Sequence, residues 1–397
     1  MPGATPKPPV SVLAPLYAAG FTTAFGAHSI AAGLGAESGG IGLGLFTFGI
    51  LLALYDVAEV ILKPVFGSLS DRIGAKPVIV AGLAAFALAS LVGTLGTTPL
   101  ILGLARLGQG AAASAFSPAS SAAVARLAGP AGAGIYFGKY GSWKGLGYVL
   151  GPLLGAALIW AGGLSALFLL MAIISATAAL WVFIAMPHLP ILPRPRYTIN
   201  DLVHQSTERS FLIPTLALAA ATGALGVCVG FLPLLGSDFH LPLAASMALV
   251  ALLALSSTLS QPVVGRLRDQ GHISDRGGMS LGLALIALGI ILLAAIPLPA
   301  TLYVASIVIG TGIGITTPLG FAHLVSTTPP ERLGRTMGTA ELGREIGDAG
   351  GPLIVGAIAT TASIAAGLGT LAALIAIASV LSALLLPRAS NARATAV

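Results

Sequence analysis

Continuous apolar stretches fill almost the whole chain, and they limit what it can fold into more than any other feature. A membrane-spanning helix needs about 20 apolar residues, and about twelve such stretches can be placed between short polar, glycine or proline breaks. Apolar residues run continuously and do not alternate with polar ones, which favours helices over a membrane barrel. The 52 glycines suit close packing between helices. The sequence therefore predicts an all-α polytopic membrane protein.

The predicted helices use nearly the full length of the chain. Only 8% of the residues are charged, against roughly 25% in a soluble domain, so no soluble catalytic domain is expected. The expected helices lie at 11–33, 41–66, 77–96, 99–124, 134–160, 163–186, 211–236, 241–263, 278–296, 299–325, 335–360 and 364–386.

The basic residues named at the end of this paragraph lie at the termini or in every second loop, which predicts the orientation in the membrane. By the positive-inside rule these loops face the cytoplasm, so both termini are cytoplasmic and the number of spans is even. We expect an integral protein of the inner (plasma) membrane, and the distribution argues against nucleic-acid binding despite a net charge of +6. The basic residues in question are Lys7, Arg72, Lys76, Arg126, Arg194, Arg196, Arg209, Arg266, Arg268, Arg276, Arg332, Arg335, Arg388 and Arg393.

Three groups of residues recur about 200 positions later, which predicts an internal repeat. We expect two pseudo-symmetric six-helix bundles, 1–186 and 211–397, joined by a proline-rich cytoplasmic linker at 187–210. A substrate site is then expected between the bundles, near the middle of the membrane. The recurring residues are Gly67 and Asp71 with Gly265 and Asp269, Gly110 and Pro118 with Gly310 and Pro318, and Gly138, Lys144, Gly147, Gly151 and Pro152 with Gly338, Arg344, Gly347, Gly351 and Pro352.

The first of these groups lies in a short motif, which we expect to form a tight loop after the second predicted helix. The motif, Gly67-x-Leu69-x-Asp71-Arg72-x-Gly74-x-Lys76, resembles the loop signature of the major facilitator superfamily, and the resemblance extends over essentially the whole chain. It implies that the Asp and Arg lock helix ends together on the cytoplasmic side. Gln270 follows Asp269 in the second copy, where a basic residue is usual, which implies a weaker lock.

Two further motifs resemble parts of the same superfamily. The stretch Gly138-x8-Gly147-x3-Gly151-Pro152-x2-Gly155 is similar to the signature of the drug:proton antiporter branch, and Arg106-x-x-Gln109-Gly110 resembles a proton-linked motif. The alternative for the first stretch is a packing stripe of small residues with a proline kink. The residues expected to control conformational change are Gly67, Asp71, Arg72, Lys76, Gly265, Asp269, Gly147, Gly151, Pro152, Gly351 and Pro352.

Several ionisable residues occur inside the predicted spans, where each costs at least about 2.5–3.5 kcal/mol and needs a partner or a function. Asp56 lies near the middle of its span with no obvious cation to pair with on its own helix, and burial favours the neutral form of such a carboxylate. We expect Asp56 to carry a proton. Glu59 and Lys63 could instead form a structural pair at a helix end. The candidate proton-coupling residues are Asp56, Glu59, Glu341, Glu345 and Asp348.

Other residues of the spans are candidates for a substrate cavity. Arg106 could pair with Asp56 or bind an anionic substrate. The aromatic residues nearby could line a cavity or lie at the membrane interface. The acids and Arg344 in 335–360 could line this cavity or only form a network that fixes the two halves together. The candidate cavity residues are Arg106, Lys144, Arg344, Tyr55, Trp143 and Tyr148.

No motif in the sequence indicates an enzyme. There is no phosphate-binding Gly-x4-Gly-Lys-Ser/Thr loop, no metal-binding spacing, and Cys228 is the sole cysteine. We therefore expect a monomeric secondary transporter without cofactor or metal, whose partners are protons, the lipid bilayer and a small-molecule substrate. The favoured hypothesis is proton-coupled antiport that exports a small organic compound by alternating access. The alternatives are a proton-linked symporter or uniporter for an organic anion or metabolite and, more remotely, an intramembrane enzyme or lipid-handling protein.

Overall fold

The structure is a computed structural model that describes residues 10–37, 45–191, 207–296 and 298–387. Within these ranges the regular secondary structure is helical and contains no β-strand, which confirms the all-α prediction. Seven of the described helices are long and apolar enough to cross a membrane. The prediction for the linker at 187–210 falls mostly on 192–206, which lies outside the described residues.

Contacts within the chain define two compact units. Unit 1 comprises 1–130, 139–194 and 328–345, and unit 2 comprises 131–138, 195–327 and 346–397. The two helices α4 and α10 each contribute residues to both units.

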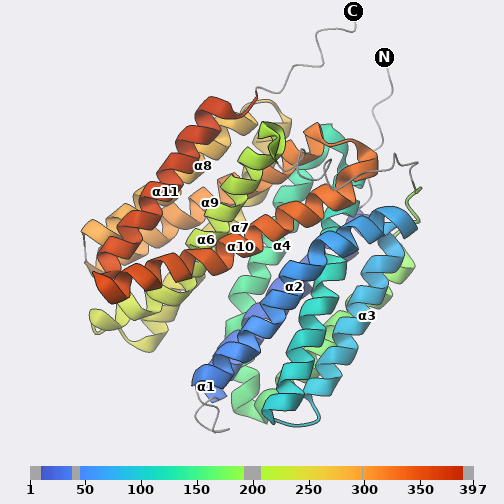
Figure 1. Cartoon of the computed structure of the whole chain (residues 1–397), viewed down its shortest axis with the longest axis horizontal. Coiled ribbons are helices and arrows are strands. Elements are labelled where there is room, and N and C mark those ends of the chain that lie inside the picture. The colour runs from blue at the N-terminus through green and yellow to red at the C-terminus, as the bar shows by residue number, and fades with distance from the viewer. Residues whose placement is uncertain (1–9, 38–44, 192–206, 297, 388–397) are drawn as a thin grey trace, which may run out of the picture. The chain divides into compact units, whose positions relative to one another are not determined.

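Unit 1 is built on α1 (Val10–Glu37), α2 (Leu45–Ile73), α3 (Ala75–Gly93) and most of α4 (Pro99–Ala185) (Figure 1). The backbone of α4 is not helical at Gly129, with φ 62°, or at Gly162 and Gly163, with φ −155° and 69°. Glycine adopts positive φ without steric cost, so the chain can turn here. These breaks divide α4 into a first (99–128), a middle (130–161) and a third segment (164–185), at the breaks that the sequence predicts.

Unit 2 consists of apolar helices packed around α9. This helix contacts α6, α7 and α8, while α11 packs on α8 and α6. The Ser379 hydroxyl donates to the Ser280 carbonyl at 2.8 Å, where α11 and α8 lie side by side (Figure 1). The elements are α6 (Arg209–Asp238), α7 (Leu243–Asp269), α8 (Asp275–Ala295), α9 (Pro299–Thr327), α11 (Ile364–Leu385) and the second half of α10 (Leu333–Thr361), which follows a short 3-10 turn, Pro330–Arg332.

The expectation of a loop at Gly67–Lys76 is wrong, because α2 continues to Ile73. No residue between Pro64 and Gly74 breaks the helix, and Leu69 and Ile73 extend its apolar pattern by one more turn. The helix ends only at Gly74, whose φ of 94° is unfavourable for other residues. Asp71 therefore lies in the last turn of a helix, and Lys63 lies well inside it.

Candidate functional site

A cluster of buried charges in unit 1 begins on α2. The Nζ of Lys63 lies 2.7 Å from Glu59 Oε1, one helical turn away, and both side chains are almost fully buried. The same Nζ lies 2.6 Å from Glu345 Oε1 and 4.0 Å from Glu341 Oε2, both on the first half of α10. The predicted Glu59–Lys63 pair exists, but it lies deep in the helix and not at its end.

Glu341 extends this cluster to the middle segment of α4. Its Oε2 lies 3.4 Å from Lys144 Nζ and 3.2 Å from Arg344 NH1. We call the six residues the buried charge network: Glu59, Lys63, Lys144, Glu341, Arg344 and Glu345. Three acids face three bases, so the network is neutral when all six are charged. Loss or gain of one proton would leave a buried charge uncompensated, which is costly.

Asp56 and Arg106 lie outside this network, although both are on helices that adjoin it. The Arg106 guanidinium lies 4.3 Å from the centre of the Tyr55 ring, a distance that allows a cation–π interaction. Its Nε donates to the Leu51 carbonyl at 3.4 Å. Among the described residues, no carboxylate lies within 4.0 Å of Arg106, which is 2% exposed, and no cation lies within 4.0 Å of the exposed Asp56.

The structure distributes the predicted cavity residues over three surroundings. Tyr55 stacks with Arg106, whereas Lys144 and Arg344 belong to the buried charge network. The two remaining aromatic residues, both on the middle segment of α4, contact α1. Trp143, 37% exposed, lies 6.4 Å from the Tyr17 ring, and Tyr148 meets His28 edge-on at 4.4 Å.

Asp71 joins the end of α2 to the start of α10. Its carboxylate accepts hydrogen bonds from the backbone N–H groups of Gly334 and Arg335, both at 2.9 Å. A carboxylate near a helix N-terminus is favoured by the helix dipole. Gly67 packs directly on Gly334, because a Cβ at position 67 would lie 2.7 Å from the Gly334 carbonyl oxygen. Arg72 is exposed and, among the described residues, has no carboxylate within 4.0 Å.

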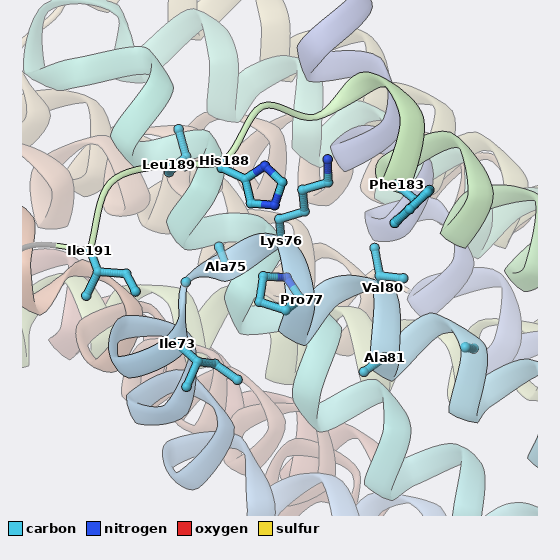
Figure 2. A pocket seen from close by; sticks show the side chains of 12 residues that line it. Ile73, Ala75, Lys76, Pro77, Val80, Ala81, Phe183, His188, Leu189 and Ile191 are labelled. Atoms are coloured by element: carbon cyan, nitrogen blue, oxygen red, sulfur yellow. The ribbon is translucent and has the colours of Figure 1, made fainter.

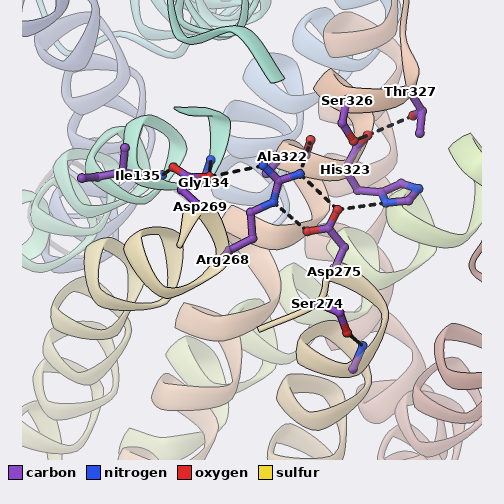
Figure 3. Close-up of polar contacts among 11 residues, drawn as sticks. Gly134, Ile135, Arg268, Asp269, Ser274, Asp275, Ala322, His323, Ser326 and Thr327 are labelled. Carbon is purple, nitrogen blue, oxygen red and sulfur yellow. Dashed lines mark hydrogen bonds and ion pairs between the residues drawn. The ribbon is translucent and has the colours of Figure 1, made fainter. Parts of the chain in front are cut away.

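Asp269 makes the corresponding contacts in unit 2. It accepts hydrogen bonds from the N–H groups of Gly134 at 3.0 Å and Ile135 at 2.7 Å (Figure 3). Gly265 packs on Gly134. Like Asp71, Asp269 thus accepts hydrogen bonds from two successive backbone N–H groups, although no basic residue follows it. A preceding cation, Arg268, lies 3.2 Å from the Asp269 carboxylate.

Arg268 also belongs to a polar cluster with Asp275 and His323 that the sequence analysis did not predict. Its Nε lies 2.9 Å from Asp275 Oδ1, and His323 Nδ1 lies 3.2 Å from Asp275 Oδ2 (Figure 3). His323 is 1% exposed and lies near the end of the apolar helix α9. An ionisable residue inside an apolar span is the signal that could have identified His323. Asp275 follows Ser274, whose hydroxyl caps α8. The sequence Ser274-Asp275 therefore looks like an ordinary helix start and does not single out Asp275.

The glycine stripes of the middle α4 segment and of α10 are packing surfaces. Gly147 and Gly151 lie against the backbone of α1, and Gly347 and Gly351 lie against α6. The elements come close because these positions lack a Cβ. Asp348, a predicted proton-coupling residue, lies beside Gly226 of α6. The prolines Pro152 and Pro352 lie inside their helices.

The described residues offer no evident metal centre. In the ranges described above, no group of three or more His, Cys, Asp or Glu side chains is close enough to hold a metal ion.

The described helices of membrane length indicate a polytopic membrane protein, and buried opposed charges are typical of functional sites in such proteins. The profile of the Major Facilitator Superfamily matches residues 11–273 and again 214–396, and the chain belongs to this superfamily. It is a transporter and not an enzyme, as the sequence predicted.

Individual relatives match part of the chain. The triacylglyceride transporter of Mycolicibacterium smegmatis is 28% identical over 193 residues, which cover 45% of this chain and 34% of that protein. The class G tetracycline resistance protein of Vibrio anguillarum is 34% identical over 116 residues, 29% of this chain and 28% of that protein. Each match thus spans about a third or less of the relative's length. The structure of the human organic anion transporter MFSD10 has the same fold, with a TM-score of 0.78 at 18% identity over 96% of this chain and 100% of that one.

Proposed function

We propose that this protein is a proton-coupled antiporter that exports a small organic compound by alternating access. The observation that carries the proposal is the buried charge network, which holds α2, α4 and α10 together by pairs that a proton or a substrate can break. The working unit in this proposal is a monomer with about twelve spans in two six-helix bundles, 1–186 and 211–397, joined by the linker 187–210. Both termini face the cytoplasm of an inner membrane.

The two bundles would rock against each other around a central substrate site. The second profile match, over 214–396, supports the proposed repeat. The tetracycline resistance relative supports export of an organic compound. In each cycle the hydrogen bonds of Asp71 and Asp269 would break and re-form, which is the gating role proposed for both motifs.

Asp56 is the proposed proton carrier. It lies near the middle of α2, its side chain is exposed, and among the described residues no cation within 4.0 Å holds it in the charged form. Glu59, Glu341, Glu345 and Asp348 are the secondary candidates. The first three carboxylates are already paired with bases, so protonation there must first break an ion pair.

A second candidate function is uptake of an organic anion by a proton-linked symporter or uniporter. Arg106 favours it, because this buried cation has, within the described part of the chain, no carboxylate closer than 4.0 Å. An anionic substrate that approached Tyr55 and Arg106 could neutralise the guanidinium.

The test uses the full chain in proteoliposomes, with tetracycline and a panel of organic cations, anions and neutral compounds. Asp56→Asn should abolish transport driven by a pH gradient and should leave substrate binding intact but no longer dependent on pH. Proton release on addition of substrate should fall to the background. Asp238→Asn, an exposed carboxylate at the end of α6, is the matched control and should behave as wild type.

Two results would change the assignment. Undiminished proton release from a well-folded Asp56→Asn variant would move the proton site to Glu341, Glu345 or Asp348. The symporter would be favoured if the proton gradient drives uptake of organic anions and the Arg106→Gln substitution abolishes this uptake.

A further inference from the structure

A cavity of about 620 Å³ lies where the end of α2, the start of α3 and the end of the third α4 segment meet (Figure 2). Two contacts fix α3 and the third segment of α4 against each other. The Ser175 hydroxyl donates to the Leu83 carbonyl at 2.8 Å, and Phe168 packs on Gly93. The cavity therefore lies beside a pair of helices that pack directly on each other.

The polar groups of this cavity are cationic or neutral. Of the described residues that line it, Lys76 and His188 alone have ionisable side chains, and none is acidic. Lys76 Nζ lies 5.5 Å from the centre of the Phe183 ring, and Figure 2 shows Lys76 between His188 and Phe183. Arg72, exposed in the last turn of α2, adds positive charge nearby. The cavity thus attracts an anion.

The rest of the wall is apolar and exposed. Phe183 is 62% exposed and Ile73 49%, and Ala81 and Ala84 are exposed on α3. Both α3 and the last part of α4 have the length and composition of membrane spans, and Lys76 lies in the first turn of α3. The cation therefore lies at the membrane boundary and the apolar wall on the hydrocarbon side of it.

We propose that this cavity is a binding site for one anionic phospholipid. The phosphate lies at Lys76 and His188, and one acyl chain lies along Ala81, Ala84 and Phe183. Charge complementarity selects the headgroup, because basic pockets between spans at the membrane surface bind anionic lipids. The exposed apolar groove selects a lipid over a soluble phosphate, since in a bilayer only an acyl chain covers such a surface.

The test is native mass spectrometry of the full chain in detergent, with added phosphatidylglycerol or phosphatidylcholine. Phosphatidylglycerol should be retained in preference. Lys76→Gln should weaken its binding about fivefold, the effect of one basic residue near an anionic headgroup. Arg209→Gln removes an exposed cation at the start of α6, outside the cavity, and should have no effect.

A second pair of variants tests the acyl groove while Lys76 is kept. Ala84→Phe should fill the groove and abolish retention of phosphatidylglycerol. Ala85→Phe places the same ring on an exposed position of α3 that does not line the cavity, so it should bind lipid as wild type. Thermal unfolding in detergent confirms that each variant is folded.

Three results would overturn the proposal. The first is equal retention of the two lipids with no effect of Lys76→Gln. The second is unchanged lipid binding by a folded Ala84→Phe variant. The third is that millimolar inorganic phosphate displaces phosphatidylglycerol from the wild-type protein and also binds the Ala84→Phe variant as tightly as wild type. This result would assign a soluble anion to the site.

Discussion

Lys63 is a central cation of the buried charge network. Its ammonium group lies within 2.7 Å of two carboxylates, Glu59 and Glu345, and its side chain is fully buried. A buried ion pair contributes little net stability, but removal of one partner leaves an uncompensated charge and typically costs about 3–5 kcal/mol.

Lys63→Met should therefore destabilise the protein by about 3–5 kcal/mol at neutral pH, because two carboxylates lose their shared cation. Unfolding in detergent, followed over a range of pH, measures this loss. Protonation of Glu59 or Glu345 removes the excess negative charge, so the destabilisation should shrink as the pH falls.

The double variant Lys63→Met, Glu59→Gln is the matched control for this prediction. It removes one cation and one anion together, so the network stays neutral and most of the lost stability should return. A double variant that is no more stable than Lys63→Met would show that packing of the lysine chain, and not its charge, matters at this position.

At the scale of elements, close contact between helix ends depends on single glycines. Gly67 lies so near α10 that a methyl group there would press on the Gly334 carbonyl oxygen and on the Gly338 Cα, at 2.7 and 3.2 Å. Neither backbone atom can move without moving the helix.

Gly67→Ala should lower the free energy of unfolding by about 1–3 kcal/mol, because overpacking outweighs the better helix propensity of alanine. The thermal midpoint of the purified protein measures the change. Gly230→Ala is the control, since nothing lies within 4 Å of that position on α6, and it should be neutral or slightly stabilising. A stabilised Gly67→Ala variant would mean that the helix ends are not held this close.

Asp71→Asn should slow transport with little change in substrate affinity. The carboxylate accepts two backbone hydrogen bonds from α10, and the neutral amide keeps one acceptor oxygen and loses the favourable interaction with the helix dipole, about 0.3–2 kcal/mol. Transport rate in proteoliposomes and substrate binding in detergent separate the two effects.

Asp269→Asn is the parallel variant, because its carboxylate makes the same two contacts with Gly134 and Ile135. It should slow transport to a similar extent. A large loss of affinity with a normal rate in either variant would place that residue in substrate binding and not in gating.

At the scale of the whole molecule, the distribution of basic residues predicts cytoplasmic termini and loops. In a variant whose sole cysteine, Cys228, is replaced by alanine, single cysteines at 37 and 238 should react with impermeant reagents from outside. Cysteines at 72, 196 and 266 should react from inside. Position 266 is chosen because Arg266 is exposed, whereas the nearby Arg268 pairs with Asp275. Labelling of either set from the opposite side would overturn the orientation.

Local patterns in the sequence were sufficient for part of this description. The apolar stretches predicted an all-α membrane protein, the motifs predicted the superfamily, and the i, i+4 spacing of Glu59 and Lys63 predicted their ion pair. These features depend on neighbours along the chain. The length of α2 was missed because its motif, rich in glycine and charge, resembles a loop, although within the motif only Gly74 has positive φ.

Only the tertiary structure decided which distant charges meet. Lys63 contacts Glu345, 282 residues away, and His323 contacts Asp275, 48 residues away on another helix. Helical periodicity predicts which residues share one face of a helix. It does not predict which face of another helix packs against that face. That choice depends on close packing at positions such as Gly67 and Gly334, where the absence of a side chain lets two backbones touch. The sequence by itself thus determined the class of the protein and the members of the buried charge network, and packing between helices determined their partners.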